Sequence, residues 1–325
     1  MVGTILLVIV VVLLIALACL WIVGERGRLL LPSTRKELLR AGPGNFLSLK
    51  SLHAYVYGRW TNQYIDVILK HVNPHLGEDG KKWWRDHYHG KILTPEQAQA
   101  IVTLDHDIPL QDLDQIIPYP MARDLVLNGP PDVLAYECAC RHSRASSCQP
   151  TQVCMVVGQP FVDFILEHNP HSSRRLTQAE AVDLLRAEHE RGHMHSAWFK
   201  DVNLDRFYAI CNCCKCCCGG IEMMMKYGNP IMASSGYVAQ VDEALCDACG
   251  ACVDTCPFDA VSLGAVIAIS WAKCMGCGVC VGQCPSEAIA LARDEKKGIP
   301  LDVRMLAQPV RRDAVPHTKN PAGLE

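Results

Sequence analysis

The sequence predicts an α+β protein in three parts: one N-terminal transmembrane helix, a mainly helical cysteine-rich middle domain, and a C-terminal domain built from a duplicated cysteine unit. An uncharged apolar run occupies residues 4–23, ten cysteines crowd the middle of the chain, and eight more recur near the C-terminus at a fixed spacing. The 325 residues suffice for two domains with appendages. We divide the chain at 1–24, 25–130, 131–232, 233–294 and 295–325.

Composition narrows the chemistry. The formal net charge is −3, which gives no support for nucleic-acid binding. The chain has 19 cysteines. In a long chain whose cysteines follow metal-binding spacings, such usage indicates metal in a reducing compartment and not a disulfide framework.

The apolar run Thr4–Val23 has the length of a membrane anchor, since about 1.5 Å per residue carries it across a hydrocarbon core of about 30 Å. A cleaved signal peptide is the less favoured alternative, because Met1–Gly3 lacks the basic residues of such peptides. Ala18-Cys19 resembles a lipoprotein site, but Ala16 stands three residues before Cys19, where such sites usually have leucine. Trp21 suits the membrane interface. The positive-inside bias places the N-terminus outside the inner membrane and the body in the cytoplasm, on the evidence of Arg26, Arg28, Arg35, Lys36 and Arg40.

The membrane-proximal region is expected to be helical. Residues 51–73 read as one helix with a buried stripe formed by Leu52, Val56, Trp60, Tyr64 and Ile68. The basic, aromatic segment Lys81–His89 reads as a solvated turn with two buried tryptophans, in preference to a patch for lipid or a partner. Thr94 begins a helix through a capping box, and Thr177 opens another over residues 179–191, which Gly192 ends.

Ten cysteines form a second system in the middle of the chain. A dense run of this kind exceeds what one [4Fe–4S] cubane needs, because neighbouring side chains of an extended segment point to opposite sides. Two cubanes would use eight thiolates and leave two, whereas one cubane with an unusual cluster or a mononuclear site is a second possibility. Free structural cysteines are disfavoured, since clustered thiols oxidise readily. The ten are Cys138, Cys140, Cys148, Cys154, Cys211, Cys213, Cys214, Cys216, Cys217 and Cys218.

Within this system, the cysteines from Cys138 to Cys154 could close one site and Cys211 to Cys218 another, with some sharing between them. We therefore expect one or two additional iron–sulfur clusters there. No Cys-x-x-Cys-His segment is present, so covalent haem is not indicated. His189, His193 and His195 precede the dense run; a histidine could replace a cysteine at a cluster, but a solvated helix end is the favoured interpretation.

The C-terminal cysteines carry the most specific signal. Cys246-x-x-Cys249-x-x-Cys252-x-x-x-Cys256-Pro257 is repeated from Cys274, 28 residues after Cys246. Written twice, this run is the bacterial ferredoxin signature for two [4Fe–4S] clusters. Zinc sites are disfavoured, because they usually take two cysteine pairs.

Each copy predicts a cysteine loop, a short helix and a short strand, Val261–Leu263 or Ile289–Leu291. Gly250 and Gly278 allow the backbone to approach the cluster. In two-cluster ferredoxins the fourth cysteine of each copy ligates the other cluster. The predicted ligand sets are therefore Cys246, Cys249, Cys252 and Cys284, and Cys274, Cys277, Cys280 and Cys256.

The chain resembles the multi-cluster ferredoxin-like proteins of anaerobic bacteria and archaea. The resemblance covers roughly residues 110–292 and includes the final two-cubane domain. It rests on Cys138–Arg141, Cys148 and Cys154, Thr177–Ala181, Gly192–His195 and Ile210–Cys218. It implies electron transfer without naming a substrate.

The favoured function is a membrane-anchored electron-transfer protein or subunit that passes single electrons through several clusters. Its expected partners are redox proteins and a membrane oxidoreductase. No flavin or nicotinamide site is evident, since no Gly-x-Gly-x-x-Gly follows a strand. Two alternatives remain: a reductase with a catalytic cluster in the middle system, and a redox sensor or iron–sulfur scaffold.

Overall fold

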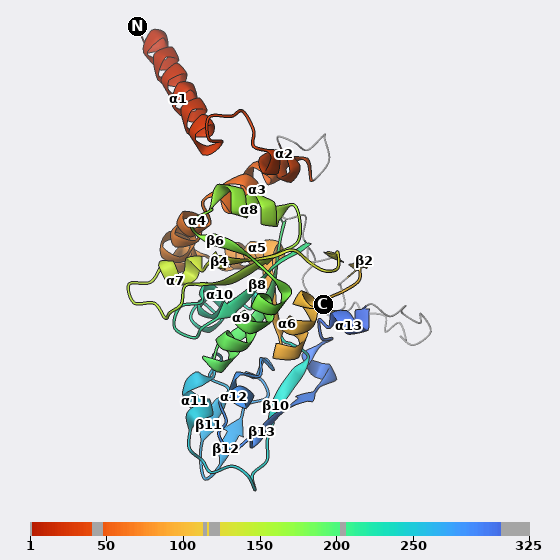
Figure 1. Cartoon of the computed structure of the whole chain (residues 1–325). Coiled ribbons are helices and arrows are strands. Elements are labelled where there is room, and N and C mark those ends of the chain that lie inside the picture. Colours follow the sequence, from red (N-terminus) through yellow and green to blue (C-terminus); the bar gives the residue numbers. More distant parts are fainter. Residues whose placement is uncertain (1, 41–47, 113–115, 117–123, 202–205, 307–325) are drawn as a thin grey trace, which may run out of the picture.

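A nine-stranded mixed sheet forms the centre of the computed structural model, which describes residues 2–40, 48–112, 116, 124–201 and 206–306 (Figure 1). The strand order is β6-β4-β5-β8-β7-β1-β9, and β3 pairs with both β8 and β2 beside this path. The strands are β1 Tyr88–Leu93, β2 Ile108–Asp112, β3 Asp124–Leu127, β4 Val133–Glu137, β5 Gln152–Val157, β6 Ser173–Leu176, β7 Met194–Lys200, β8 Arg206–Cys213 and β9 Met232–Ala233.

The prediction of a mainly helical middle domain was wrong. Strands β4 to β8 all lie within the predicted middle domain, and β1 to β3 join the same sheet from the chain before residue 130. The strands gave little sequence signal, because the strands at the centre of the sheet are covered on both faces. Every residue of β7 is buried, so the polar and apolar alternation of a half-exposed strand is missing.

Helices cover both faces of the sheet (Figure 1). One face carries the larger hydrophobic core, where helices α3, α4, α5 and α8 pack. The other carries a second core with α6 and α9. These helices are α3 Leu49–Arg59, α4 Thr61–Val67, α5 Glu78–His87, α6 Pro95–Val102, α8 Phe161–His168 and α9 Gln178–Glu190.

Both predicted capping boxes are present. The Thr94 hydroxyl accepts a hydrogen bond from the Gln97 backbone at the start of α6, and the Gln97 side chain accepts one from the Thr94 backbone. Thr177 and Glu180 exchange the same pair of bonds at the start of α9. These local signals were reliable because each cap satisfies backbone N–H groups that the helix itself leaves unpaired.

The helix predicted over residues 51–73 is interrupted, and its predicted buried stripe holds only in part. Leu52, Val56 and Trp60 are exposed, whereas Tyr64 and Ile68 are partly buried against the larger core. The backbone leaves helical geometry at Trp60, and a short π-helical turn, η2 Ile68–Val72, and a 3₁₀ turn, η3 Asn73–His75, follow α4. Val56 is 42% exposed, whereas Tyr55 and Tyr57 are buried. The core-facing side of α3 includes Gly58, where an added Cβ would lie 2.7 Å from the Phe164 ring. A residue without a side chain therefore sets which face packs.

The segment Lys81–His89 is also corrected. It forms most of helix α5 and the start of β1, and is not a turn. Trp84 is buried, but Trp83 is 51% exposed and stacks on His87. One tryptophan therefore joins the core, and the other lies on the surface.

Helix α1 Val2–Gly24 extends away from the body (Figure 1). Among the described residues it is the one helix long and apolar enough to cross a membrane: its span Ile5–Gly24 has a mean hydropathy of 3.5, and no residue of its most apolar 18-residue window is buried. The membrane-spanning assignment rests on length and composition, and a signal sequence meets the same criteria. The buried carboxylate of Glu25 follows directly and accepts hydrogen bonds from the Thr34 and Tyr55 hydroxyls at 3.0 and 2.9 Å.

The C-terminal repeats fold into a small domain at the opposite end of the molecule from α1 (Figure 1). Each repeat supplies one strand to each of two small sheets, so that β10 pairs with β13 and β11 with β12. The strand predicted at Val261–Leu263 matches β11, and the one predicted at Ile289–Leu291 lies within β13. The elements are β10 Tyr237–Val241, α11 Ala251–Thr255, β11 Val261–Leu263, β12 Ile267–Ile269, α12 Val279–Gly282 and β13 Ile289–Arg293.

Short helices complete the described chain. Two of them, α7 and α10, lie next to middle cysteines in the sequence. The short helices are α2 Pro32–Leu39, α7 Ala139–His142, α10 Gly219–Met225, η5 Glu295–Lys297 and α13 Val303–Leu306. Of the predicted C-terminal tail 295–325, residues 307–325 lie outside the described residues.

Candidate iron–sulfur centres

The eight C-terminal cysteines gather into two groups, each with members from both repeats. Burial raises the pKa of the Cys252 thiol, and the charge of Cys284 from the other repeat raises it further. Burial likewise raises the pKa of Cys277 to about 12, and Cys256 from the first repeat contributes to the rise. The groups are Cys246, Cys249, Cys252 with Cys284, and Cys274, Cys277, Cys280 with Cys256.

Backbone N–H groups point at these sulfurs in a pattern that follows the repeat. The N–H of Ala260 donates to Cys256 Sγ at 3.3 Å, and that of Ala288 donates to Cys284 Sγ at 3.3 Å. Gly250 and Gly278 have φ of +79° and +80°, a conformation that glycine adopts without strain. Four thiolate donors per group, with N–H groups that stabilise charge on sulfur, fit a [4Fe–4S] cluster.

The two groups differ in exposure. All four cysteines of the group that contains Cys274 are buried, whereas Cys249 of the other group is exposed. Burial and hydrogen bonds to sulfur both set the reduction potential of a cluster. Two clusters held here would therefore differ in potential, and the one beside Cys249 would be the more accessible to a partner.

The middle cysteines do not divide as their order along the chain suggests. Cys148, from the loop after α7, joins three cysteines of the dense run. Cys138, Cys140 and Cys154 join the remaining three cysteines of the dense run, Cys211, Cys213 and Cys218. The first set is Cys148, Cys214, Cys216 and Cys217. The second is Cys138, Cys140, Cys154, Cys211, Cys213 and Cys218.

The strand register brings the second set together. In β8, Cys211 and Cys213 point to the face of the larger core, while Asn212 between them points to the other face. Cys154 lies on the same face of neighbouring β5, where Met155 pairs with Ile210. Three sulfurs thus lie on one sheet face, although the sequence separates Cys154 from Cys211 by more than fifty residues.

An apolar cavity adjoins this set. It has a volume of about 70 Å³, and all six cysteines of the set are among its lining residues. Ile68, Trp84 and Trp198 form part of its wall. A second cavity of about 80 Å³ shares four of the six cysteines and extends toward Tyr57 and Tyr208, whose hydroxyls lie 2.8 Å apart.

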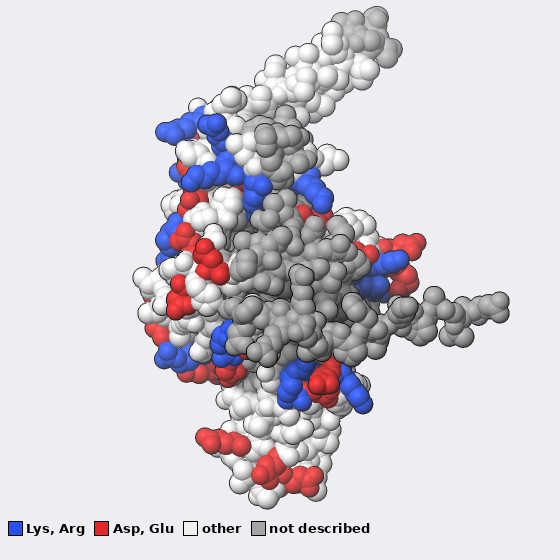
Figure 2. Space-filling view, turned by 90° about the vertical axis from the view of Figure 1, so that its right-hand side faces the viewer, with Lys and Arg blue, Asp and Glu red and all other residues white. Residues whose placement is uncertain are grey.

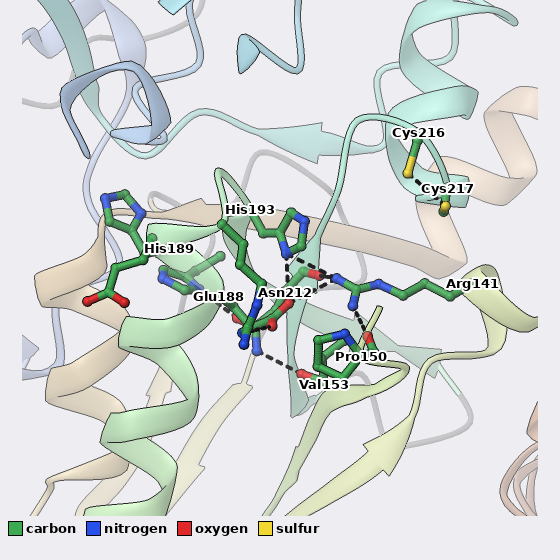
Figure 3. Close-up of polar contacts among 12 residues, drawn as sticks. Arg141, Pro150, Val153, Glu188, His189, His193, Asn212, Cys216 and Cys217 are labelled. Atoms are coloured by element: carbon green, nitrogen blue, oxygen red, sulfur yellow. Dashed lines mark hydrogen bonds and ion pairs between the residues drawn. The ribbon is translucent and has the colours of Figure 1, made fainter. Parts of the chain in front are cut away.

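A buried arginine ties the middle cysteine loops together (Figure 3). Arg141 is fully buried and donates to Glu188 Oε2 at 2.9 Å and to the Asn212 carbonyl at 3.3 Å. It also donates to the carbonyl of Pro150. These bonds fix the loop that carries Cys148 against the end of β8. The sequence signal was the Cys-x-Cys-Arg segment, but the partners of this arginine could not be read from the sequence.

The histidine interpretation is corrected by the same network. His193 is buried and pairs with Glu188 Oε2 at 2.7 Å, and His195 is fully buried in β7. His195 Nδ1 lies 2.6 Å from the Asn212 side-chain oxygen, and burial lowers the pKa of this histidine to about 4. A solvated helix end therefore describes neither residue. Their described bonds go to oxygen and nitrogen atoms.

Lys200 is a buried cation that the sequence did not reveal. Its Nζ lies 5.2 Å from the Tyr57 ring centroid and 4.9 Å from that of Tyr88, with Tyr64 and Trp84 also near. Burial lowers its pKa to about 8. Aromatic faces attract a desolvated cation, which explains how the residue is accommodated beside the cysteine cavity.

The dense cysteine run also contacts the C-terminal domain. Lys215 pairs with Asp259 at 2.9 Å and donates to the Asp254 carbonyl at 3.4 Å. On the other side of the junction, the Gln283 amide donates to the Glu190 carbonyl at 3.0 Å. These bonds hold the two cysteine systems side by side.

Comparisons with known proteins identify the C-terminal part. Residues 239–262 and 267–290 each match the family model described as a 4Fe-4S binding domain, Fer4. No curated protein and no solved structure matches the chain. The chain therefore carries a ferredoxin-type domain at residues 239–290, which implies [4Fe–4S] binding and supports an iron–sulfur electron-transfer role.

Proposed function

We propose that this protein is a membrane-anchored electron-transfer protein, which passes single electrons through several iron–sulfur clusters between a redox donor and an acceptor oxidoreductase. The observation that carries the proposal is the ferredoxin-type domain, matched in both repeats and bonded to a second cysteine system. Clusters placed side by side can relay electrons without a mobile carrier. The Lys215–Asp259 pair keeps the junction between them short.

The exposure of the cysteines supports a direction for exchange with partners. Cys249 lies at the surface of the C-terminal domain, so a cluster there suits a soluble redox protein. The four cysteines of the group that contains Cys274 are buried. A donor that docks at the exposed cluster would load electrons, which would then move inward.

The anchor and its orientation rest on charge and composition. Arg26, Arg28, Arg35 and Lys36 are exposed directly after α1. Lys and Arg side chains gather at the base of the apolar rod in Figure 2, and acidic side chains occupy the opposite tip. Basic residues flank the cytoplasmic end of a membrane helix, which supports a single pass with the body in the cytoplasm at the inner membrane. This geometry suits a membrane oxidoreductase as one partner.

Electron transfer is tested with the full chain, purified anaerobically in detergent and reconstituted with iron and sulfide. Stopped-flow absorbance follows reduction by the methyl viologen radical and reoxidation by ferricytochrome c. We expect EPR signals of reduced [4Fe–4S] clusters and reoxidation within seconds. Clusters that stay oxidised, or that reduce and then fail to pass electrons to the cytochrome, would contradict the proposal.

The junction gives a sharper version of this test. Lys215→Gln removes the charge that pairs with Asp259 and should slow reduction of the middle centres while the C-terminal clusters reduce normally. Lys36→Gln is the matched control, because Lys36 of α2 pairs with Asp163 of α8 at 3.8 Å, at the end of the molecule opposite the C-terminal domain (Figure 1). Equal slowing in both variants would show that the junction has no special part in transfer.

A second candidate function is a reductase whose catalytic cluster lies in the middle system. The cavities beside Cys138 and Cys154, together with the paired hydroxyls of Tyr57 and Tyr208, favour it. A small molecule bound at a cluster would shift its EPR signal. Turnover by the isolated chain would establish this function over simple transfer.

A further inference from the structure

We propose that the ten middle cysteines form two metal sites of different size that interleave along the chain. The four-thiolate set holds one tetrahedral ion, Zn²⁺ or Fe²⁺, and the six-thiolate set holds one iron–sulfur cluster with more than four irons. The inference rests on the proposed function only for the choice of iron–sulfur chemistry. The sites themselves follow from the placement of the sulfurs.

The four-thiolate set is compact. The sulfurs of Cys148, Cys214, Cys216 and Cys217 all lie within 4.8 Å of one another, and those of Cys216 and Cys217 are 2.8 Å apart. Metal–sulfur bonds of about 2.3 Å place the four sulfurs of a tetrahedral site about 3.8 Å apart. The four sulfurs therefore lie close enough together to share a single ion.

A cubane would need a wider arrangement. Each of its four thiolates binds a different iron, so the sulfurs must surround the whole metal–sulfide core and not one atom. Among the described residues, the four-thiolate set is the one group of three or more cysteine, histidine or carboxylate ligands that lies within 4.8 Å. The ferredoxin cysteines, whose spacing specifies cubanes, are more widely separated. They provide a reference within the same chain.

The six-thiolate set is arranged as an open chain of sulfurs. Cys140 and Cys154 each contact Cys138. From Cys154 the contacts continue to Cys211 and Cys213 and end at Cys218. No three of these sulfurs meet the 4.8 Å spacing of the compact set, so one ion cannot draw them together without a change of backbone.

The space beside the six sulfurs is large enough for more than one atom. The cavity of about 70 Å³ is several times the roughly 10–15 Å³ that one water needs on the same measure. The adjoining cavity of about 80 Å³ shares Cys138, Cys140, Cys154 and Cys211. A polynuclear cluster would therefore occupy space that is already lined by its ligands.

The number of ligands sets the size of that cluster. One cubane offers four corner irons, so it would leave two of the six thiolates unused. Two cubanes of four irons each, joined through one ligand that binds one iron of each, offer six free corner irons, which equals the number of thiolates. Buried cysteines that ligate nothing would also place unpaired thiols in one apolar pocket. The geometry points to a cluster that uses all six.

Metal and sulfide analysis of the full chain tests both assignments. Cys214→Ser/Cys216→Ser should lose about one metal ion per chain with inorganic sulfide unchanged. Cys154→Ser/Cys213→Ser should lose more than four irons with the corresponding sulfide. Cys19→Ser in α1 is the matched control and should lose neither. Electron-transfer activity is not needed for these counts, so they stand or fall independently of the proposed function.

Two outcomes would overturn the assignment. Loss of about four irons with sulfide from Cys214→Ser/Cys216→Ser would place a cubane at the compact set. Loss of four irons or fewer from Cys154→Ser/Cys213→Ser would reduce the larger site to a cubane or less.

Discussion

Replacing Arg141 should lower the free energy of unfolding far more than replacing a surface arginine. Arg141 and Glu188 both have side chains with 0% exposure and pair at 2.9 Å, and the guanidinium also donates to one backbone carbonyl in the loop after α7 and to one near the end of β8 (Figure 3). In Arg141→Met these carbonyls lose their donor and Glu188 loses its buried partner. Removing one member of a buried pair costs about 3–5 kcal/mol.

The lower part of that range applies, because Glu188 keeps contacts to Arg191 and His193, both at 2.7 Å. We expect a loss of about 3 kcal/mol, or a fall in melting temperature of roughly 6–12 °C at about 2–4 °C per kcal/mol. Arg186→Met is the matched control, since Arg186 pairs with Asp183 on the surface at 3.0 Å and an exposed pair contributes about 0–1 kcal/mol.

Both variants would be unfolded by heat under anaerobic conditions, with circular dichroism as the measurement. The network also predicts a pH dependence. Burial opposes ionisation of Glu188, but His193 and Arg141 outweigh it and lower the pKa of this carboxyl. Its contribution to stability is therefore present above its unfolded pKa of about 4.3 and is lost as the pH falls through the lower folded value. Melting of Arg141→Met within 2 °C of Arg186→Met would refute the reasoning.

Three further predictions follow from the fold. Cys256→Ala should remove the cluster held by residues 274–280 and spare the other; the reverse loss, seen by EPR, would refute the crossed assignment. Deleting residues 2–24 should release the protein from membranes with iron content unchanged, and a C-terminal reporter active only outside the cytoplasm would contradict the orientation. Burial lowers the pKa of Lys200 to about 8, so the unfolded state binds more protons between pH 8 and 10.5 and stability should rise across that range. Lys200→Met should abolish this rise in the free energy of unfolding; an unchanged rise would assign it to other groups.

The sequence alone specified the parts whose signals are local. Spacing within one short segment determines the ferredoxin repeat, because three ligands of each cluster share one loop. A capping box likewise uses only four consecutive residues, so the starts of α6 and α9 were predicted from Thr94 and Thr177. The apolar helix before Glu25 was predicted from the length of the run and its lack of charge.

Tertiary structure decided what depends on pairing between distant strands. The mixed sheet escaped notice because strands covered on both faces, such as β7, lack alternation. The packing face of α3 was set by Gly58, a position where hydrophobicity gives no signal. Burial of His195 and Lys200 likewise followed from their strand and not from their residue type.

The middle cysteines show the same limit most clearly. Composition established that ten thiols crowd the middle of the chain and indicated metal, but order along the chain left their grouping open. Register between β5 and β8 brings Cys154 beside Cys211, and the turn after β8 carries Cys214 toward Cys148. Alternation along a strand separates neighbours in sequence, while sheet pairing unites distant residues. The partition of the thiols therefore became visible only in the folded chain.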